Sequence, residues 1–274
     1  MDYREHPPAA PLRRLVRSYW FLTGRAGVDE PAADPALPDG SPELIINLGD
    51  PFRALSADGH AVLQPLTMLV GQITRPFSVA PTGRVDLVAA RLEAFGAAGL
   101  WPRVASLTDR WADGEAIPHA RLAEAREALS KATTLEHRLT ILDHHLLGVF
   151  AAAKQPDWRV ESAVNAIRAT GGAEPLERIA ADVGTTPRNL QRLFAAQVGI
   201  PPKLLARITR FQRVFAAWRT DPASLSRVAV GCGYFDQSHL VRDFRDFAGT
   251  APAAFLASVP EFTGFFLGPD KGAR

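Results

Sequence analysis

Two short stretches of polar and cationic side chains are the part of this sequence that most clearly indicates a function. Arginine can donate two hydrogen bonds to guanine and glutamine can pair through two bonds with adenine, so such side chains suit base edges in a DNA groove. The first set is Arg188, Asn189, Gln191 and Arg192. The second set is Gln237, Ser238, His239, Arg242 and Arg245. Any one of them alone is as well explained as a solvated polar residue, so the elements that position them decide the interpretation.

The second set belongs to a stretch, Leu225 to Phe255, whose pattern predicts a helix, a tight turn and a second helix. Gly233 permits the turn, and Asp236 is a good N-cap for the helix that follows. The apolar faces are Val228, Ala229 and Cys232 in the first helix and Leu240, Phe244 and Phe247 in the second. A second helix with a polar, cationic outer face is typical of a helix-turn-helix DNA reader.

The chain contains this pattern twice. Leu176 to Leu205 repeats it upstream, with Gly184 in the place of Gly233. Leu190-x-Arg192-x-Phe194 corresponds to Leu240-x-Arg242-x-Phe244, and Gly199 and Pro202 correspond to Gly249 and Pro252. Thr186 is predicted to cap the first recognition helix, with Pro187 in its first turn. Both copies keep the turn glycine, the apolar core positions and the surface arginine, which indicates that one helix-turn-helix unit has been duplicated. Pro202 to Arg219 predicts a linker helix, whose arginines face either phosphate or solvent.

GYFDQSHLVRDFRDFAGTAPAAF, together with the upstream copy, resembles the DNA-binding domain of AraC/XylS-type transcriptional regulators over about the last hundred residues. The usual aromatic after the turn glycine is kept as Tyr234, whereas the usual aromatic of the recognition helix is Leu240 here. The common final Tyr-Arg or Phe-Arg is Phe255-Leu256. The resemblance implies that Arg188, Gln191 and Arg192 read bases, and that the partners are double-stranded DNA, RNA polymerase and a small-molecule effector.

The first half has strand-like patterning. Short apolar runs lie between proline and glycine turn signals, which favours a sandwich or barrel. The expected strands are Ser18 to Thr23, Leu44 to Leu48, Thr67 to Val70, Phe77 to Val79 and Arg84 to Leu92. The family resemblance likewise implies a small cupin-like effector domain. We therefore expect an α+β chain: an N-terminal cupin-like β-barrel with flanking helices, and a C-terminal all-α domain with two helix-turn-helix motifs joined by a linker helix. Candidate pocket residues are Trp20, Asn47, Arg75 and Arg91.

Helices are expected at 122–131, 135–150 and 158–169. The apolar stripe of 135–150 has two explanations, packing on the barrel or a homodimer contact. The predicted domains are 1–152 (sensor and dimerisation), 157–258 (DNA binding) and a tail at 259–274. Three tail side chains are candidates for docking on the body of the protein, namely Phe262, Phe265 and Phe266.

Composition narrows the function classes. Residues 157–258 hold 13 Lys/Arg against 9 Asp/Glu, whereas the remainder holds 18 against 20, so the cationic part coincides with the predicted DNA reader. The single cysteine, Cys232, falls on a core position and excludes a disulfide framework. Neither a long apolar run nor an N-terminal apolar signal is present, so we expect no membrane span and a cytoplasmic location.

An enzyme is not expected. His144 and His145 are adjacent on a predicted helix and would point about 100° apart, so they cannot easily share a metal ion. No nucleophile elbow or phosphate-binding glycine loop occurs, and we predict neither metal nor cofactor. The sequence thus predicts a sequence-specific DNA-binding transcription regulator, gated by a small molecule in the N-terminal domain. The alternatives are a regulator gated by a protein partner or ungated, with a structural barrel, and, more remotely, a cupin-type enzyme fused to a helix-turn-helix domain.

Overall fold

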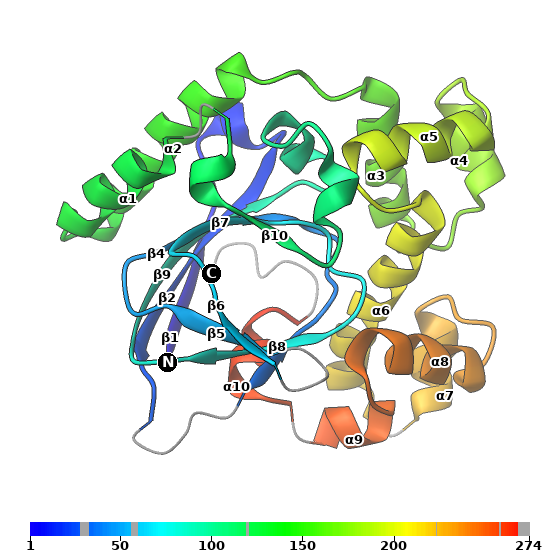
Figure 1. The fold of residues 1–274 in the computed structure, drawn as a ribbon. Helices are drawn as coiled ribbons and strands as arrows, with labels where there is room; N and C mark the ends of the chain where they lie inside the picture. Colours follow the sequence, from blue (N-terminus) through cyan, green and yellow to red (C-terminus); the bar gives the residue numbers. More distant parts are fainter. Residues whose placement is uncertain (28–32, 56–59, 119–120, 223, 258, 268–274) are drawn as a thin grey trace.

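The computed structural model describes residues 1–27, 33–55, 60–118, 121–222, 224–257 and 259–267 of the 274. Two facing antiparallel sheets form the N-terminal half, and a group of helices packs beside them (Figure 1). The expected α+β class is therefore confirmed, with the strands and the helix-turn-helix helices in separate parts of the chain. No helix in these described ranges is long and apolar enough to span a bilayer.

The larger sheet has the strand order β1-β2-β9-β4-β7-β10, and the smaller has β3-β8-β5-β6. Their bounds are β1 (Asp2–His6), β2 (Val16–Arg25), β3 (Asp34–Ala36), β4 (Glu43–Asn47), β5 (Phe52–Leu55), β6 (Ala61–Leu63), β7 (Thr67–Val70), β8 (Phe77–Pro81), β9 (Arg84–Leu92) and β10 (Trp111–Asp113). All five expected strands are present, two of them with the predicted bounds. The short strands β1, β3, β5, β6 and β10 were not expected.

Side chains alternate between two cores along the central strands, as the period of a β-strand requires. On β2, Trp20 and Leu22 face the space between the sheets, whereas Tyr19 and Phe21 face the opposite side. β9 behaves in the same way and is buried on both faces from Leu87 onward. A strand covered on both faces appears as a continuous apolar run, which is why its sequence predicted it well.

Two helices cover the outer face of the larger sheet, α1 (Leu122–Lys131) and α2 (Leu135–Ala152) (Figure 1). Leu142, Leu146 and Phe150 of α2 are buried in the core of the same chain. Asp143 accepts hydrogen bonds from the Tyr19 hydroxyl and the Ala9 amide, both at 2.9 Å. The apolar stripe of α2 therefore packs on the sheet and is not available as a homodimer contact, which corrects that part of the expectation.

The remaining helices are α3 (Trp158–Ala169), α4 (Leu176–Asp182), α5 (Pro187–Gln197), α6 (Pro202–Thr220), α7 (Leu225–Gly231), α8 (Gln237–Ala248), α9 (Pro252–Ala257) and α10 (Glu261–Phe265). Four short 3₁₀ segments lie upstream, η1 (Ala10–Leu12), η2 (Gly96–Gly99), η3 (Val104–Leu107) and η4 (Gly114–Ala116). The predicted caps are confirmed: the Thr186 hydroxyl accepts from the Asn189 amide and the Asp236 carboxylate from the His239 amide. Both turn glycines, Gly184 and Gly233, have the positive φ that the tight turn requires.

The two halves share one apolar core, which runs from the larger sheet into the helices around α6. Polar contacts join them as well. Thr108 Oγ1 donates to the Gly199 carbonyl at 2.9 Å, Gln212 Nε2 donates to the Pro38 carbonyl at 2.7 Å, and Arg168 pairs with Glu93. A change in one half can therefore reach the other through direct packing.

Candidate DNA interface and ligand pocket

The first recognition helix is α5, which the Thr186 cap and the buried side chains of Leu190, Leu193 and Phe194 hold against α3 and α4. With that face buried, helical periodicity turns the intervening residues outward. Three members of the first predicted set are exposed, namely Arg188, Gln191 and Arg192.

The fourth member, Asn189, is half-buried and already bonded within the helix. Its Nδ2 donates to Thr185 Oγ1 at 2.8 Å, and its Oδ1 accepts from Arg192 Nη2 at 2.9 Å. Both ends of the amide are thus used inside the protein. In this arrangement Asn189 orients the Arg192 guanidinium, whose remaining donors make no hydrogen bond to the part of the chain that the structure describes.

The second recognition helix is α8, with Leu240, Phe244 and Phe247 buried beneath it. Its polar face carries four exposed members of the second set, which are Gln237, Ser238, Arg242 and Arg245. His239 differs, because its ring packs edge-on against Tyr234 with the ring centroids 5.1 Å apart, and it is half-buried. Phe235, just before the Asp236 cap, is 89% exposed, which the sequence pattern did not indicate.

Three of the four arginines on the linker helix α6 make contacts with neighbouring helices and loops of the DNA-binding domain. Arg207 binds Asp243 and Asp246 of α8 and lies over the Phe247 ring at 5.0 Å. Arg210 Nη1 donates to the Gly172 carbonyl at 2.7 Å, and Arg213 reaches the Gly231 carbonyl at 3.4 Å.

Arg207 and Arg210 are half-buried and Arg213 is exposed, so contact of these arginines with phosphate or solvent stays a prediction beside the internal contacts. Sequence periodicity placed them off the apolar face of α6 but could not show that neighbouring helices stand there. Arg207 and Arg213 join α6 to the second helix-turn-helix motif, and Arg210 joins it to the loop between α3 and α4, just ahead of the first motif.

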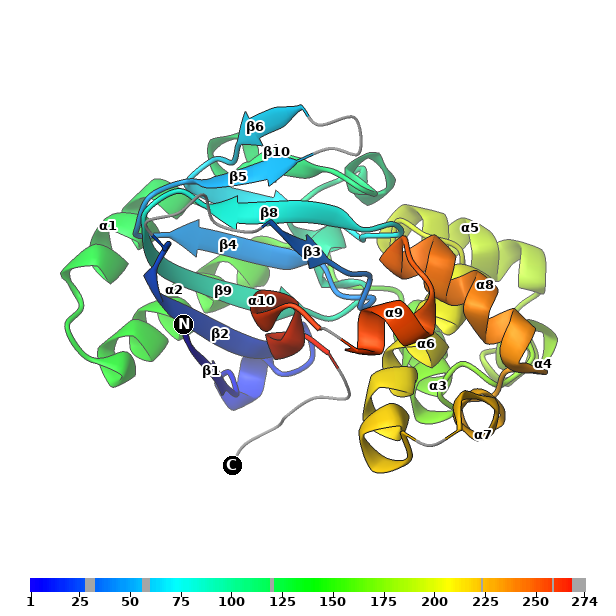
Figure 2. The ribbon, with the colours of Figure 1, turned by 90° about the horizontal axis from the view of Figure 1, so that it is seen from below.

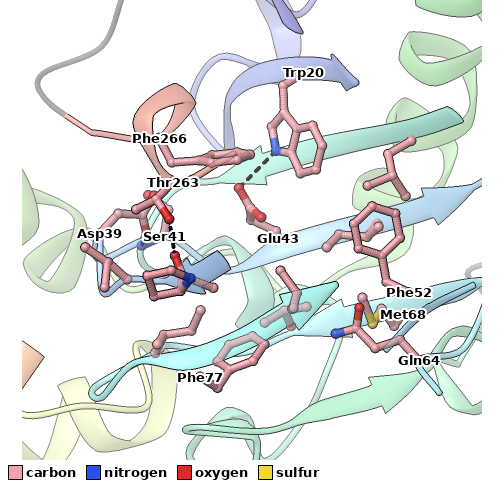
Figure 3. Close-up of a pocket in the computed structure, with 18 of the residues that line it drawn as sticks. Trp20, Asp39, Ser41, Glu43, Phe52, Gln64, Met68, Phe77, Thr263 and Phe266 are labelled. Carbon is pink, nitrogen blue, oxygen red and sulfur yellow. Dashed lines mark hydrogen bonds between the residues drawn. The ribbon is translucent and has the colours of Figure 1, made fainter. Parts of the chain in front are cut away.

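A cavity of about 90 Å³ lies between the two sheets. Ile45 and Leu87 line it from the larger sheet. Trp20 lines it from the same sheet, and Phe52 and Phe77 line it from the smaller one (Figure 3). Polar atoms come from a few positions at its edge, namely Asp39, Ser41, Glu43, Asn47, Gln64 and Thr263. An apolar cavity with a few convergent polar groups is the usual form of a small-molecule site.

The acidic side of the cavity is built around Arg91, which is buried behind it. Arg91 Nη1 donates to Glu5 at 2.8 Å and its Nε donates to Glu43 Oε1 at 3.2 Å, with Asp39 at 3.5 Å. Trp20 Nε1 also donates to Glu43 Oε1, at 2.9 Å (Figure 3). Burial raises the pKa of Glu43 by disfavouring its charged form, and the nearby Arg91 opposes that shift.

The C-terminal tail closes one side of the cavity. α10 lies against β3 and beside β2, so the chain returns from the helical half to the sheets (Figure 2). Thr263 Oγ1 donates to the Pro35 carbonyl at 2.7 Å, and Phe266 packs edge-on against Trp20 with centroids 5.2 Å apart. Phe266 also covers the Arg91 guanidinium at 5.3 Å, and Phe265 stacks on Tyr3 at 5.0 Å. Docking of Phe265 and Phe266 is confirmed, whereas the side chain of Phe262 lies outside the described part.

The four predicted pocket residues have different positions. Trp20 and Asn47 line the cavity, although Asn47 bonds to the backbone of the Gly49–Asp50 turn. Arg91 lies behind the lining and acts on it through Glu43. Arg75 is not brought into the cavity, because its side chain is 76% exposed and pairs with Asp109 at 3.2 Å. It follows β7 in an irregular segment, where strand alternation gives no guide to direction.

Comparison with known protein families agrees with the geometry of α5 and α8. Residues 179–258 match a family model described as a helix-turn-helix domain. The chain carries an AraC-type DNA-binding domain. The AraC-type match includes α5, α6, α7 and α8, and so both recognition helices. The protein is accordingly a DNA-binding transcription regulator. Residues 4–113, which contain the described strands from β2 to β10 and most of β1, match a second model described as a domain of unknown function (DUF6597).

Solved structures similar to this chain include ToxT from Vibrio cholerae O395, with 10% identity, covering 88% of this chain and 98% of that chain at a TM-score of 0.49. Another is ToxT of the same strain bound to (E)-4-(8-methylnaphthalen-1-yl)but-3-enoic acid, with 11% identity, coverages of 86% and 98% and a TM-score of 0.49. Unsaturated fatty acid bound wild-type ToxT from Vibrio cholerae strain SCE256 has 10% identity, coverages of 93% and 98% and a TM-score of 0.47. No curated protein matches this chain.

The cavity also involves residues that sequence patterns had not indicated, above all Asp39 and Glu43. Asp39 belongs to the Pro38-Asp39-Gly40 turn signal, and Glu43 begins the apolar run of β4. A carboxylate at the start of a buried strand is a weak signal that could have drawn attention to Glu43, since unpaired acids are rarely buried.

Proposed function

We propose that DNA binding by this regulator is gated by a small ligand that occupies the cavity between the two sheets. The proposal rests on two segments that line the cavity and also connect with the DNA-binding helices, one by packing on α6 and the other by continuing from α9. One is the loop of residues 37–41, and the other is the tail that follows α9.

The loop connects the cavity with the linker helix. Asp39 lines the cavity, while its neighbour Pro38 accepts a hydrogen bond from Gln212 of α6 at 2.7 Å. Gly40 lies so close to α6 that an added methyl group would stand 2.8 Å from Leu205 Cδ1. A ligand that moves Asp39 therefore acts on the helix that spaces the two recognition helices.

The tail connects the cavity with the second motif. Phe255 of α9 packs against Phe215 of α6 and Phe244 of α8, with centroid distances of 5.9 and 5.8 Å. Only a few residues later, Thr263 and Phe266 line the cavity. Occupancy of the cavity and the position of α9 are therefore coupled through a short covalent path.

Gating of this kind requires a ligand that binds one arrangement of the protein more tightly than the other. A preference of about 1–3 kcal/mol changes affinity at the second site by roughly 5- to 150-fold. Small displacements suffice, because packed interfaces such as that of α6 with α7 and α8 change between discrete arrangements.

On the DNA side, α5 and α8 are proposed to enter successive major-groove segments about one turn, or roughly 34 Å, apart. The base-reading side chains would be Arg188, Gln191, Arg192, Gln237, Ser238 and Arg242, with Arg245 on phosphate and with Asn189 and His239 supporting their neighbours. Contact with RNA polymerase, a cytoplasmic location and the absence of catalytic activity belong to the same proposal. A homodimer remains a prediction and would need a surface other than the buried stripe of α2.

The DNA part is tested by selecting bound sequences from a random DNA pool with the full chain at several salt concentrations. Two enriched elements about ten base pairs apart, with an affinity that falls steeply with salt, are expected. A single enriched element would contradict the use of both helices.

Gating is then tested on the selected operator without knowing the ligand. Met68→Phe adds volume in the cavity, and Val62→Phe adds the same ring on the exposed β6 as a control. We expect Met68→Phe to change operator affinity by at least about fivefold and Val62→Phe to leave it unchanged. If Met68→Phe stays folded and binds the operator as the wild type does, the proposed gating is wrong.

A further inference from the structure

The charged side chains that line the cavity are of one sign. Among the described residues that line it, the charged ones are Asp39 and Glu43, and neither lysine nor arginine is among them. The other polar contributors, Ser41, Asn47, Gln64 and Thr263, are neutral. The rest of the lining is apolar, with aromatic rings from Trp20, Phe52, Phe77 and Phe266.

Arg91 does not neutralise this acidic side. Arg91 is shared by three carboxylates, Glu5, Asp39 and Glu43, and the Arg17 guanidinium donates to Ser41 of the lining at 2.8 Å. These five charged groups carry one excess negative charge when all are ionised. Glu5 also accepts a hydrogen bond from the Tyr3 hydroxyl, which adds no charge. The excess falls toward the cavity, because Asp39 and Glu43 line it and Arg91 does not.

Glu43 has an oxygen available to a ligand. The hydrogen bonds from Trp20 and Arg91 both go to Oε1, and within the described residues no hydrogen bond reaches Oε2. The side chain is 18% exposed and stands between Trp20 and Phe266 at the edge of the cavity (Figure 3). Since burial raises the pKa of Glu43, a cation beside Oε2 would stabilise the charged form.

We propose that the cavity binds a compact amphipathic cation: a protonated amine whose ammonium group meets Glu43 Oε2 and Asp39, and whose apolar body lies among Phe52, Met68 and Phe77. This inference rests on the proposed function for its regulatory consequence, but the binding itself does not depend on gating. The aromatic rings of Trp20 and Phe266 flank the ammonium position and add a cation–π attraction of about 0.5–2 kcal/mol. The cavity volume of about 90 Å³ has room for a small apolar body such as one ring.

The opposite ligand class, a carboxylate with an apolar body, is the sharpest competitor. It would bring a third negative charge beside Asp39 and Glu43, at a cost that grows in a low-dielectric cavity. It could pair with Arg91 only after Phe266, whose ring covers the guanidinium at 5.3 Å, had moved away. The two ligand classes therefore predict opposite orders of affinity.

The test uses three probes with one ring and different head groups: 2-phenylethylamine, 2-phenylethanol and 3-phenylpropionate. Binding to the full chain is measured by calorimetry and by the rise in thermal midpoint. We expect the amine to bind at least tenfold more tightly than either of the others. Equal or tighter binding of the alcohol or the carboxylate would overturn the inference, and so would the absence of binding by all three.

Variants locate the site. Glu43→Gln keeps the shape of the side chain and its acceptor for Trp20 but removes the charge, so it should lose at least tenfold in amine affinity. Glu124→Gln, on an exposed position of α1, is the matched control and should bind the amine as the wild type does. If Glu43→Gln fails to fold, the amine affinity of Asp39→Asn tests the same site. Retention of amine affinity in a folded Glu43→Gln or Asp39→Asn protein would contradict the assignment.

The same samples separate this inference from the gating proposal, because operator affinity is measured with and without the amine. Amine binding that leaves operator affinity unchanged would support the ligand class and contradict gating. A shift in operator affinity caused by the alcohol or the carboxylate, with no amine binding, would support gating and overturn the ligand class.

Discussion

Arg207 Nη2, on the linker helix, lies 2.7 Å from Asp243 Oδ1, on the second recognition helix. Asp243 is 3% exposed and Arg207 34%, so the carboxylate is buried while its partner reaches solvent. Arg207 also binds Asp246 on the same helix and covers Phe247. The orientation of α8 relative to α6 is therefore fixed by a charged contact as well as by apolar packing.

Arg207→Ala should destabilise the protein, because it leaves the buried Asp243 without its cation. Removing one partner of a buried pair costs about 3–5 kcal/mol, and the partial exposure of Arg207 places the expected loss near 2–3 kcal/mol. Denaturant unfolding of the full chain measures it. Arg227→Ala, which breaks an exposed pair with Asp221, should cost much less, because solvent screens that pair. Equal losses in the two variants would show that the Arg207 contact is no stronger than a surface pair.

Arg192→Ala and Arg242→Ala should each weaken operator binding by about 1–3 kcal/mol while leaving the unfolding free energy nearly unchanged. Both side chains are exposed on the outer faces of their recognition helices. Arg4→Ala, an exposed arginine on β1, is the control for loss of one positive charge far from α5 and α8. Affinity that survives either recognition-helix substitution would remove that residue from the proposed reading set.

Replacing Asn189 tests a different role. Its amide bridges Thr185 and Arg192, so Asn189→Ala should weaken operator binding by releasing the Arg192 guanidinium. A double-mutant cycle with Arg192→Ala measures this dependence. If Asn189 acts only through Arg192, the double variant should bind like Arg192→Ala alone. Fully additive losses would instead indicate that Asn189 contacts DNA directly.

Helical periodicity and cap chemistry were sufficient to predict α5 and α8, together with the exposure of Arg188, Arg192 and Arg242. The duplicated motif strengthens that prediction, because the two copies have the same pattern of apolar and polar positions. The cavity could not be predicted in the same way. Its acidic edge joins the turn at Asp39, the strand at Glu43 and the tail at Phe266, and no local pattern shows that these segments meet. The edge strands β3 and β6 were not predicted, because a strand of three residues is too short to show a hydrophobic period.

Alanine substitutions at two glycines of the DNA-binding domain can distinguish the cost of backbone strain from the cost of steric crowding. Gly184 has φ of 63° with open space where a Cβ would lie, so Gly184→Ala should cost only the left-handed penalty of about 1–2 kcal/mol. Gly172 has φ of 76°, and its Cβ would stand 2.2 Å from the Ala206 carbonyl oxygen of α6. Gly172→Ala should therefore lose a further 1–3 kcal/mol or more, since the linker helix must shift. Equal thermal midpoints for the two variants would contradict this view of the α6 contact.

The tail contributes stability as well as closing the cavity. Phe266→Ala removes a ring that packs on Trp20 and covers Arg91, and should cost about 1–3 kcal/mol, less than a fully buried phenylalanine would. Phe235→Ala removes a ring that is almost fully exposed, and its effect should stay within about 0.5 kcal/mol. Urea unfolding measures both. A Phe266 variant as stable as the Phe235 variant would mean that the tail is not held by this contact.

Cys232 offers a probe of the second motif in the intact protein. The thiol is 1% exposed, and burial raises its pKa, opposed by Arg213, so little thiolate is present or accessible near neutral pH. Reaction with a disulfide reagent should be at least about a hundredfold slower in the native chain than in denaturant, because the motif must open first. Operator DNA should slow the reaction further, since it binds only the closed motif. Native labelling as fast as denatured labelling would show that α7 does not hold Cys232 in the core.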